Sequence, residues 1–222
     1  MILKANKLSK SYKEPKKVEI LREITLSVNE GESVAIMGPS GVGKSTLLHI
    51  LGTLEEPTSG SLEILGSNAL VGDRSVMRNQ HIGFVFQNFN LLEEYPVLEN
   101  VLMPAKVGRK PIGRGSDAFT HAEALLERVG LTSHKHQIAK HLSGGEKQRV
   151  AIARAFCNNP DLILADEPSG NLDEGNSKLI HELLITSTRD FKKSLIVVTH
   201  NAALASLCDR KYLLTDGSLT SI

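Results

Sequence analysis

The sequence predicts an α/β fold in which a sheet-forming core is interrupted by a helical insert. A β-rich apolar run at 33–37 precedes the glycine-rich stretch G-P-S-G-V-G-K-S-T at 38–46, and an apolar helical pattern follows it. Two later apolar runs, at 162–166 and 194–199, are typical of parallel strands buried on both faces. Residues 88–158, by contrast, show helical periodicity and few strand-like runs. We therefore expect one domain over 1–222, with a core of 1–87 and 159–222 and a helical subdomain of 88–158.

The elements before the insert follow from alternating side chains and turn residues. Residues 2–8 and 24–28 predict two strands, with a polar loop at 13–17 between them. A turn at 29–32 leads into the apolar run before the glycine-rich stretch. We expect residues 57–60 to end the helix that follows this stretch, and residues 61–66 to form a strand.

Capping residues mark the helices of the insert. Ser116 is the expected N-cap of a helix whose apolar residues share one face, and Gly130 is its expected terminator. Ser143 is the expected N-cap of a second helix, which includes 150–155. A third helix is expected at 179–187, between the two buried strands.

Composition excludes several classes of protein. The chain has 222 residues and a formal net charge of +1, so its overall charge favours neither nucleic acid nor anionic lipid as a partner. Its 2 cysteines lack metal-ligand spacing and indicate a reducing compartment. We find no secretory signal, and no apolar run approaches the roughly 20 residues that span a bilayer. A role at a membrane would therefore require a membrane partner.

The glycine-rich stretch has the G-x-x-x-x-G-K-S spacing of a phosphate-binding loop. Its glycines let backbone N–H groups point at phosphate oxygens, and the next helix adds the positive end of its dipole. Lys44 supplies a charge for the outer phosphates, and the Ser45 hydroxyl suits Mg²⁺. The predicted nucleotide contacts are Gly38, Pro39, Ser40, Gly41, Val42, Gly43, Lys44, Ser45 and Thr46.

Two adjacent carboxylates, Asp166 and Glu167, end a predicted buried strand. Side chains alternate along a strand, so these neighbours can serve different purposes. Asp166 is suited to holding Mg²⁺, and Glu167 to activating a water molecule. Without a phosphate-binding loop in the same chain, the pair would be interpreted as a solvated strand end.

A second helix start, at Ser143, Gly144 and Gly145, also has the features of an anion site. Ser143 can cap the helix, and the glycines permit close approach of a ligand to the backbone. The segment is either a capped helix with no ligand or a site for the phosphate held by another subunit.

The order of these motifs resembles that of ABC-transporter ATPase subunits over essentially the whole chain. The motifs are the phosphate-binding loop, the signature segment 142–145, the strand end 162–167, the segment 169–173 and Thr199-His200. The resemblance implies a P-loop NTPase core with an N-terminal antiparallel β-subdomain. It also implies hydrolysis of ATP with Mg²⁺, a head-to-tail homodimer with ATP at the interface, and permease partners in a membrane.

The resemblance further implies roles for particular residues. His200 would hydrogen-bond the γ-phosphate, and Gln87 would contact Mg²⁺ or the attacking water. The implied catalytic residues are Glu167, His200 and Gln87, and the implied metal ligands are Ser45, Gln87 and Asp166. Ser143, Gly144 and Gly145 would contact the γ-phosphate held by the opposite subunit. Asp173 would belong to the nucleotide site by helping to align the two sites across the interface.

Tyr12 occupies the place of an aromatic residue that stacks on adenine in this family. Stacking discriminates weakly between bases, so a preference for ATP over GTP would follow family precedent. Alternatively, Tyr12 packs on the β-subdomain and has no contact with a ligand.

Two stretches, 87–92 and 98–104, are similar to the group of ABC ATPases that comprises lipoprotein-release ATPases, MacB and FtsE. The short chain favours a lipoprotein-release ATPase or FtsE over MacB, and the length of the 88–115 region and the element at 99–104 favour the lipoprotein-release ATPase. Such a subunit would be bound peripherally at the cytoplasmic face of the inner membrane, with LolC/LolE-like permeases. An FtsE-like adaptor that signals to cell-wall enzymes and a MacB-like export ATPase are the alternatives. Residues 91–104 would either line a permease-binding groove or belong to the core of the helical subdomain.

The chain departs from the family pattern at two positions. Asn201 replaces the aspartate that commonly follows the histidine, which removes a charge beside the γ-phosphate. Ser169 replaces a common threonine and keeps the hydroxyl. The replacement at Asn201 would affect the rate of ATP hydrolysis.

Overall fold

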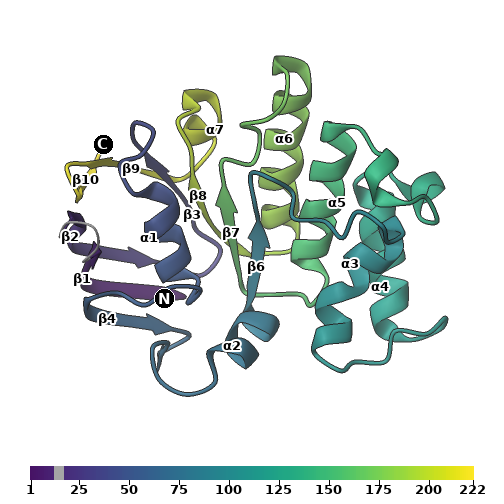
Figure 1. Cartoon of the computed structure of the whole chain (residues 1–222), viewed down its shortest axis with the longest axis horizontal. Coiled ribbons are helices and arrows are strands. Elements are labelled where there is room, and N and C mark those ends of the chain that lie inside the picture. Colours follow the sequence, from purple (N-terminus) through teal and green to yellow (C-terminus); the bar gives the residue numbers. More distant parts are fainter. Residues whose placement is uncertain (13–17) are drawn as a thin grey trace.

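The computed structural model describes residues 1–12 and 18–222 (Figure 1). The polar loop predicted at 13–17 lies outside the described residues. One sheet is antiparallel, with the strand order β2-β1-β4-β5. Its strands are β1 (Leu3–Tyr12), β2 (Val18–Val28), β4 (Ser59–Ile64) and β5 (Ser67–Asn68). This sheet is the N-terminal β-subdomain that the family resemblance implies.

The second sheet has the strand order β10-β9-β3-β8-β7-β6. The predicted carboxylates Asp166 and Glu167 lie at the end of its strand β7. It is parallel from β9 to β6, and only β10 pairs in the antiparallel sense. Its strands are β3 (Ser33–Met37), β6 (Ile82–Val85), β7 (Leu162–Asp166), β8 (Ser194–Val198), β9 (Arg210–Thr215) and β10 (Ser218–Ser221). Because β3, β7 and β8 are parallel, their carboxyl ends meet at one edge of the sheet.

The helices fall into two groups. Those between and around the strands are α1 (Lys44–Leu51), α2 (Arg74–His81), α6 (Glu174–Asp190) and α7 (Ala202–Ser206). Those of the insert are α3 (Val97–Val107), α4 (Asp117–Arg128) and α5 (Gly144–Phe156), with short 3₁₀ turns at Thr132–His134 and Ala139–His141. Figure 1 shows α3, α4 and α5 side by side beyond β6, on the opposite side of the molecule from the antiparallel sheet.

The central strands are buried on both faces, as their continuous apolar runs predict. On β7, Leu162 and Leu164 belong to the core shared with α1 and the antiparallel sheet. Ile163 and Ala165 belong to the core shared with the insert and α6. The parallel sheet is therefore the middle layer of the molecule, and both hydrophobic clusters hold its strands in place.

The structure confirms the predicted caps. Ser116 accepts a hydrogen bond from the N–H of Phe119, and Gly130 takes a φ of 70° just after α4. Ser143 caps α5 in a capping box with Glu146. Local polar chemistry was therefore sufficient to predict where these helices begin or end.

Several boundaries differ from the prediction. Helix α1 ends at Leu51 and not at 57–60, because Gly52 is its C-cap and Thr53 follows with a left-handed φ of 59°. A Cβ at Gly52 would lie 2.1 Å from the Phe84 ring, so this position requires glycine. Strands β1 and β2 run longer than predicted, through bulges at which Lys7 and Glu23 have positive φ. Helix α2 was not predicted, since it is short, mostly polar and contains no buried residue.

Candidate functional site

The glycine-rich loop joins the end of β3 to the start of α1. Gly43 has a φ of 104°, and a Cβ there would lie 2.5 Å from Ile20 Cγ2, so this position requires glycine. Lys44, the first residue of α1, is 7% exposed. Its ammonium group donates to the carbonyl oxygens of Gly38 at 2.9 Å and Pro39 at 3.1 Å. The loop therefore encloses the buried ammonium group of Lys44.

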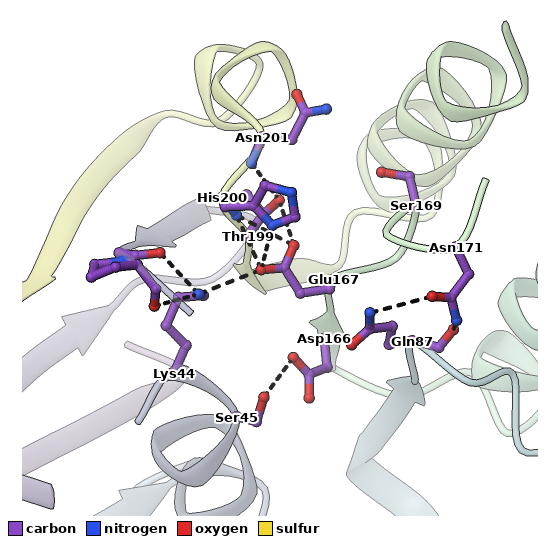
Figure 2. Close-up of polar contacts among 12 residues, drawn as sticks. Lys44, Ser45, Gln87, Asp166, Glu167, Ser169, Asn171, Thr199, His200 and Asn201 are labelled. Atoms are coloured by element: carbon purple, nitrogen blue, oxygen red, sulfur yellow. Dashed lines mark hydrogen bonds and ion pairs between the residues drawn. The ribbon is translucent and has the colours of Figure 1, made fainter. Parts of the chain in front are cut away.

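The two carboxylates at the end of β7 point in different directions (Figure 2). Asp166 Oδ1 accepts a hydrogen bond of 3.0 Å from Ser45 Oγ. Burial raises the pKa of the Asp166 carboxyl, and the bond from Ser45 opposes that shift. Glu167 turns instead toward Lys44, whose Nζ lies 3.5 Å from Glu167 Oε1. Adjacent residues thus reach two different parts of the loop and helix.

Glu167 is held by the residues that follow β8. Its Oε2 accepts from the Thr199 hydroxyl at 3.1 Å, and its Oε1 accepts from the His200 backbone N–H at 3.1 Å. The His200 ring is also close, with Nδ1 3.0 Å from Oε1. Glu167 has a φ of 40°, a left-handed conformation that costs a non-glycine residue roughly 1–3 kcal/mol. The surrounding hydrogen bonds hold it there.

Gln87 follows β6 and lies close to the end of β7 (Figure 2). Its side-chain Nε2 lies 3.4 Å from Asn171 Oδ1. In return, the Asn171 side chain donates to the Gln87 carbonyl at 3.0 Å and to Asn88 Oδ1 at 3.1 Å. The segment after the carboxylates is thereby joined to the segment that enters the helical insert.

Tyr12 borders a pocket of about 220 Å³ beside the glycine-rich loop. The pocket is lined by Tyr12, Ile20, Gly41, Gly43, Lys44, Ser45 and Thr46. Tyr12 is 40% exposed, and its hydroxyl donates to Glu55 Oε1 at 2.6 Å. That hydrogen bond is the main reason why the pKa of the tyrosine is raised. The exposed ring offers a flat wall next to the loop.

The signature segment lies at the start of α5, in the insert. Ser143 Oγ accepts from the Glu146 N–H at 3.3 Å, while the Glu146 carboxylate accepts from the Ser143 N–H at 2.8 Å. The Ser143 hydroxyl also donates to Glu146 Oε2 at 2.7 Å, and this bond, together with that from the Ser143 N–H, lowers the pKa of Glu146. A Cβ on Gly145 would lie 2.9 Å from Asn176 Oδ1, so the start of α5 packs closely against the start of α6. Asp173 caps α6 by accepting from the Asn176 N–H at 3.0 Å.

The predicted site residues fall into two groups in space. Contacts join Lys44, Ser45, Asp166, Glu167 and His200 at the carboxyl edge of the parallel sheet. Tyr12 borders the same loop. Ser143 caps α5, Gly144 and Gly145 begin it, and Asp173 caps α6, whose start packs against the start of α5. Helices α5 and α1 lie apart in Figure 1.

The sequence alone assigned no separate role to Thr199 and Asn171, whose side chains hydrogen-bond predicted site residues. Thr199 bonds the Glu167 carboxylate, and Asn171 bonds Gln87. Thr199 directly follows β8, and the edge rule for parallel strands predicts that it lies beside the end of β7. Asn171 had no comparable signal, because its partner comes from a segment 84 residues away.

Within residues 1–12 and 18–222, no helix combines the length and the apolar character needed to cross a membrane.

Proteins with known names are similar to this chain over nearly its full length. The chain is 51% identical to the lipoprotein-releasing system ATP-binding protein LolD of Protochlamydia amoebophila, over 99% of this chain and 96% of that protein. It is 44% identical to the LolD protein of Cytophaga hutchinsonii, with 97% of each chain covered.

Solved structures of ABC transporter cassettes are similar to this chain over nearly its full length. The dimeric structure of MJ0796, a bacterial ABC transporter cassette, matches with a TM-score of 0.89 and 38% identity, over 98% of this chain and 96% of that one. A post-hydrolysis dimer of the same cassette, bound to ADP and Pi, matches with a TM-score of 0.88 and 37% identity, over 100% of this chain and 98% of that one. The profile of the ABC transporter family matches residues 21–170. The chain therefore belongs to the ABC transporter family, as an ATP-hydrolysing, ATP-binding subunit.

Proposed function

We propose that this chain is the ATPase of a membrane complex that releases lipoproteins from the inner membrane. It would act at the cytoplasmic face of that membrane, bound to LolC/LolE-like permeases. The names of its relatives, at 44–51% identity over nearly the full chain, support this assignment. The observation that carries the enzymatic part is the position of Glu167, within reach of both Lys44 and His200.

Hydrolysis joins a water oxygen to the γ-phosphorus and breaks the bond from that phosphorus to the bridging oxygen, giving ADP and phosphate. We assign Glu167 to accept the proton of the attacking water. Lys44 and His200 both contact Oε1 of this carboxylate. A γ-phosphate would attract the same two side chains and thereby free the carboxylate for water.

The donor atoms near Asp166 suit Mg²⁺. The Ser45 hydroxyl and the Asp166 carboxylate already lie 3.0 Å apart, and hard oxygen ligands are those that Mg²⁺ prefers. Because burial raises the pKa of Asp166, a cation at this position would stabilise its charged form. We propose Ser45 and Asp166 as ligands, with the Gln87 side chain as a third. The ion would neutralise charge on the phosphates.

The nucleotide would lie along the glycine-rich loop, with its base against Tyr12. The proposed contacts of the phosphates are the backbone N–H groups of residues 38–46 and the start of α1. The exposed face of Tyr12 beside the loop supports stacking on adenine.

A second copy of the chain would complete the site. The glycine-rich start of α5 has anion-binding character but lies away from the loop of its own chain (Figure 1). We propose a head-to-tail homodimer in which Ser143, Gly144 and Gly145 reach the γ-phosphate of the opposite copy, with Asp173 at the interface. Dimeric assembly of the similar cassette MJ0796 supports this arrangement.

The permeases would dock between the core and the insert. A pocket of about 210 Å³ lies there, lined by Phe84 and Phe86 from the core side and by Pro104 and Arg154 from the insert. Within 91–104, Leu98 and Leu102 are buried in the helical core, whereas Leu92 is 41% exposed. Docking would therefore use only part of that stretch. We propose that residues 88–158 move as one subdomain against the core when ATP binds.

Affinity purification from native membranes tests the proposal. The tagged Glu167→Gln variant, supplied with ATP, should retain its membrane partners, and mass spectrometry should identify lipoprotein-releasing permeases together with lipoproteins. Recovery of an FtsX-like permease would replace lipoprotein release with the adaptor function. Recovery of an export permease would favour a MacB-like role. A parallel purification with Lys44→Ala, which should not retain ATP, controls for partners that bind independently of nucleotide.

A further inference from the structure

A buried hydrogen-bonded pair lies just beyond the end of β7. Ser169 Oγ is 2.7 Å from His181 Nε2, and the two residues are 8% and 3% exposed. His181 is on α6, and Ser169 lies in the segment that joins β7 to that helix. Burial lowers the pKa of the His181 ring and thereby favours its neutral form. Two polar groups are thus buried together and satisfy each other.

The segment 167–173 is folded around Ser169. The Gly170 N–H donates to the Glu167 carbonyl at 2.9 Å, and the Leu172 N–H donates to the Ser169 carbonyl at 3.1 Å. The Ser169 side chain is the point at which the first half of this segment bonds to the middle of α6. Its attachment to His181 therefore helps to set the path of the chain between the carboxylates and α6.

Functional groups lie on both sides of Ser169. Two residues before it, Glu167 has its strained left-handed φ of 40°. Two residues after it, Asn171 donates to the Gln87 carbonyl at 3.0 Å. Between them, a Cβ on Gly170 would lie 2.9 Å from Gln87 Nε2, so the turn fits closely against that side chain. A shift of Ser169 would displace Glu167, Gln87 or both.

Packing alone does not explain a histidine at this position. Burying an imidazole and a hydroxyl has a desolvation cost that an apolar pair of similar volume would avoid. The cost is offset only while the hydrogen bond between them is formed. A contact of this kind specifies one arrangement of the turn, whereas apolar side chains tolerate several.

We infer that His181 is a positioning residue for ATP hydrolysis, acting through Ser169 on the turn that presents Glu167 and Gln87. His181 does not touch the nucleotide itself. The inference rests on the proposed role of Glu167, and it adds a requirement for the buried Ser169–His181 bond.

Steady-state ATPase kinetics on a set of variants tests the inference. Ser169→Ala and His181→Phe each remove the bond, and kcat should fall about 5–20-fold, while KM for ATP changes by less than about twofold. Ser169→Thr and His181→Gln keep a hydrogen-bonding group and should recover most of kcat. The double variant Ser169→Ala/His181→Phe should be no slower than either single variant, because one shared bond is lost.

Thr188→Val is the matched control. Thr188 is also on α6 and is 2% exposed, but its hydroxyl bonds only the Leu184 and Ile185 carbonyls of its own helix. The Thr188→Val variant should retain the kcat of the unmodified chain, even if its thermal midpoint falls. If Ser169→Ala and His181→Phe also lower only the thermal midpoint and keep kcat, the pair is structural and the inference is overturned.

The kinetics of Glu167→Gln separate the inference from the proposed function. A loss of turnover in Glu167→Gln with normal turnover in Ser169→Ala would overturn the positioning role alone. Normal turnover in Glu167→Gln would overturn the assigned role of Glu167, and with it the inference. If His181→Phe does not fold, Ser169→Ala compared with Ser169→Thr decides the question.

Discussion

Lys44 and Glu167 form an ion pair at the centre of the site, with Nζ 3.5 Å from Oε1 and side chains only 8% and 12% exposed. The cation proposed to bind phosphate thus contacts the carboxylate proposed to activate water. Phosphate and carboxylate are competing anions for one ammonium group, so nucleotide binding and release of Glu167 would be coupled. This coupling determines the direction of the effects that we expect for Lys44→Ala on ATP binding and for Glu167→Gln on turnover.

Replacing Lys44 with alanine should weaken ATP binding about 10–100-fold, because a buried charge-assisted contact with phosphate is worth roughly 1.5–3 kcal/mol. Isothermal titration calorimetry with ATP measures the effect. Lys178→Ala is the control, since Lys178 is 68% exposed and pairs with Glu174 on α6. An unchanged dissociation constant in Lys44→Ala would contradict the phosphate-binding role.

Replacing Glu167 with glutamine should lower kcat about 10²–10³-fold and leave ATP binding intact, because the amide cannot accept a proton from water. The ATP-bound variant should also accumulate as a dimer. Phosphate release measures turnover, and light scattering after size-exclusion chromatography measures mass. Glu127→Gln, an exposed change on α4, should retain full turnover. Full turnover in Glu167→Gln would show that another group activates the water.

The parts of this molecule that could be predicted are those fixed by local chemistry. The phosphate-binding loop, the cap at Ser143 and the buried strand ending at Asp166 each depend on a few consecutive residues. Strand alternation predicts that Asp166 and Glu167 point apart. However, Glu167 lies beyond the end of β7, and its left-handed φ of 40° sets its direction.

The remainder depends on contacts between distant segments. Gly52 at the end of α1 is a local stop signal that the prediction of 57–60 overlooked, whereas its close packing against Phe84 depends on a distant segment. Helix α2 is short and mostly polar, and its only packing against the core that the structure describes is through the partly buried Met77. The Ser169–His181 bond joins residues whose individual sequence signals are weak, since serine and histidine are common on protein surfaces.

Tyr12→Ala should raise KM for ATP about tenfold, because stacking of a base on an aromatic ring is worth roughly 1–3 kcal/mol. Tyr12→Phe should keep KM near that of the unmodified chain, since it loses the hydrogen bond to Glu55 but keeps the ring. Initial rates over a range of ATP concentrations give both values. An unaltered KM in Tyr12→Ala would favour the alternative in which Tyr12 only packs on the β-subdomain.

Ser143→Ala should lower the free energy of unfolding by about 1 kcal/mol, because it breaks the capping box at the start of α5. Urea denaturation followed by circular dichroism measures the change. Ser133→Ala, at an exposed position in a nearby 3₁₀ turn, should stay within about 0.5 kcal/mol of the unmodified chain. Equal destabilisation in both variants would mean that the capping box contributes nothing specific.

Asp209 provides a prediction about pH. Its Oδ2 accepts from the Ser33 N–H at 2.8 Å and the Ser33 hydroxyl at 2.6 Å, and these bonds lower the pKa of the carboxyl. The unfolded chain, with an aspartate pKa of about 3.9, therefore binds more protons than the folded chain over the interval between the two values. The contribution to stability is present above about pH 4 and is lost as the pH falls through the folded-state pKa.

Asp209→Asn should therefore be less stable than the unmodified chain at about pH 6, and the difference should shrink as the pH is lowered to about 3. Urea unfolding of both proteins at several pH values measures this difference. The titration of carboxylates that both proteins share, such as Glu146, cancels when the two are compared. A constant difference across the range would mean that the Ser33 bonds stabilise the charged and neutral carboxyl equally. The lowered pKa of Asp209 would then have to be rejected.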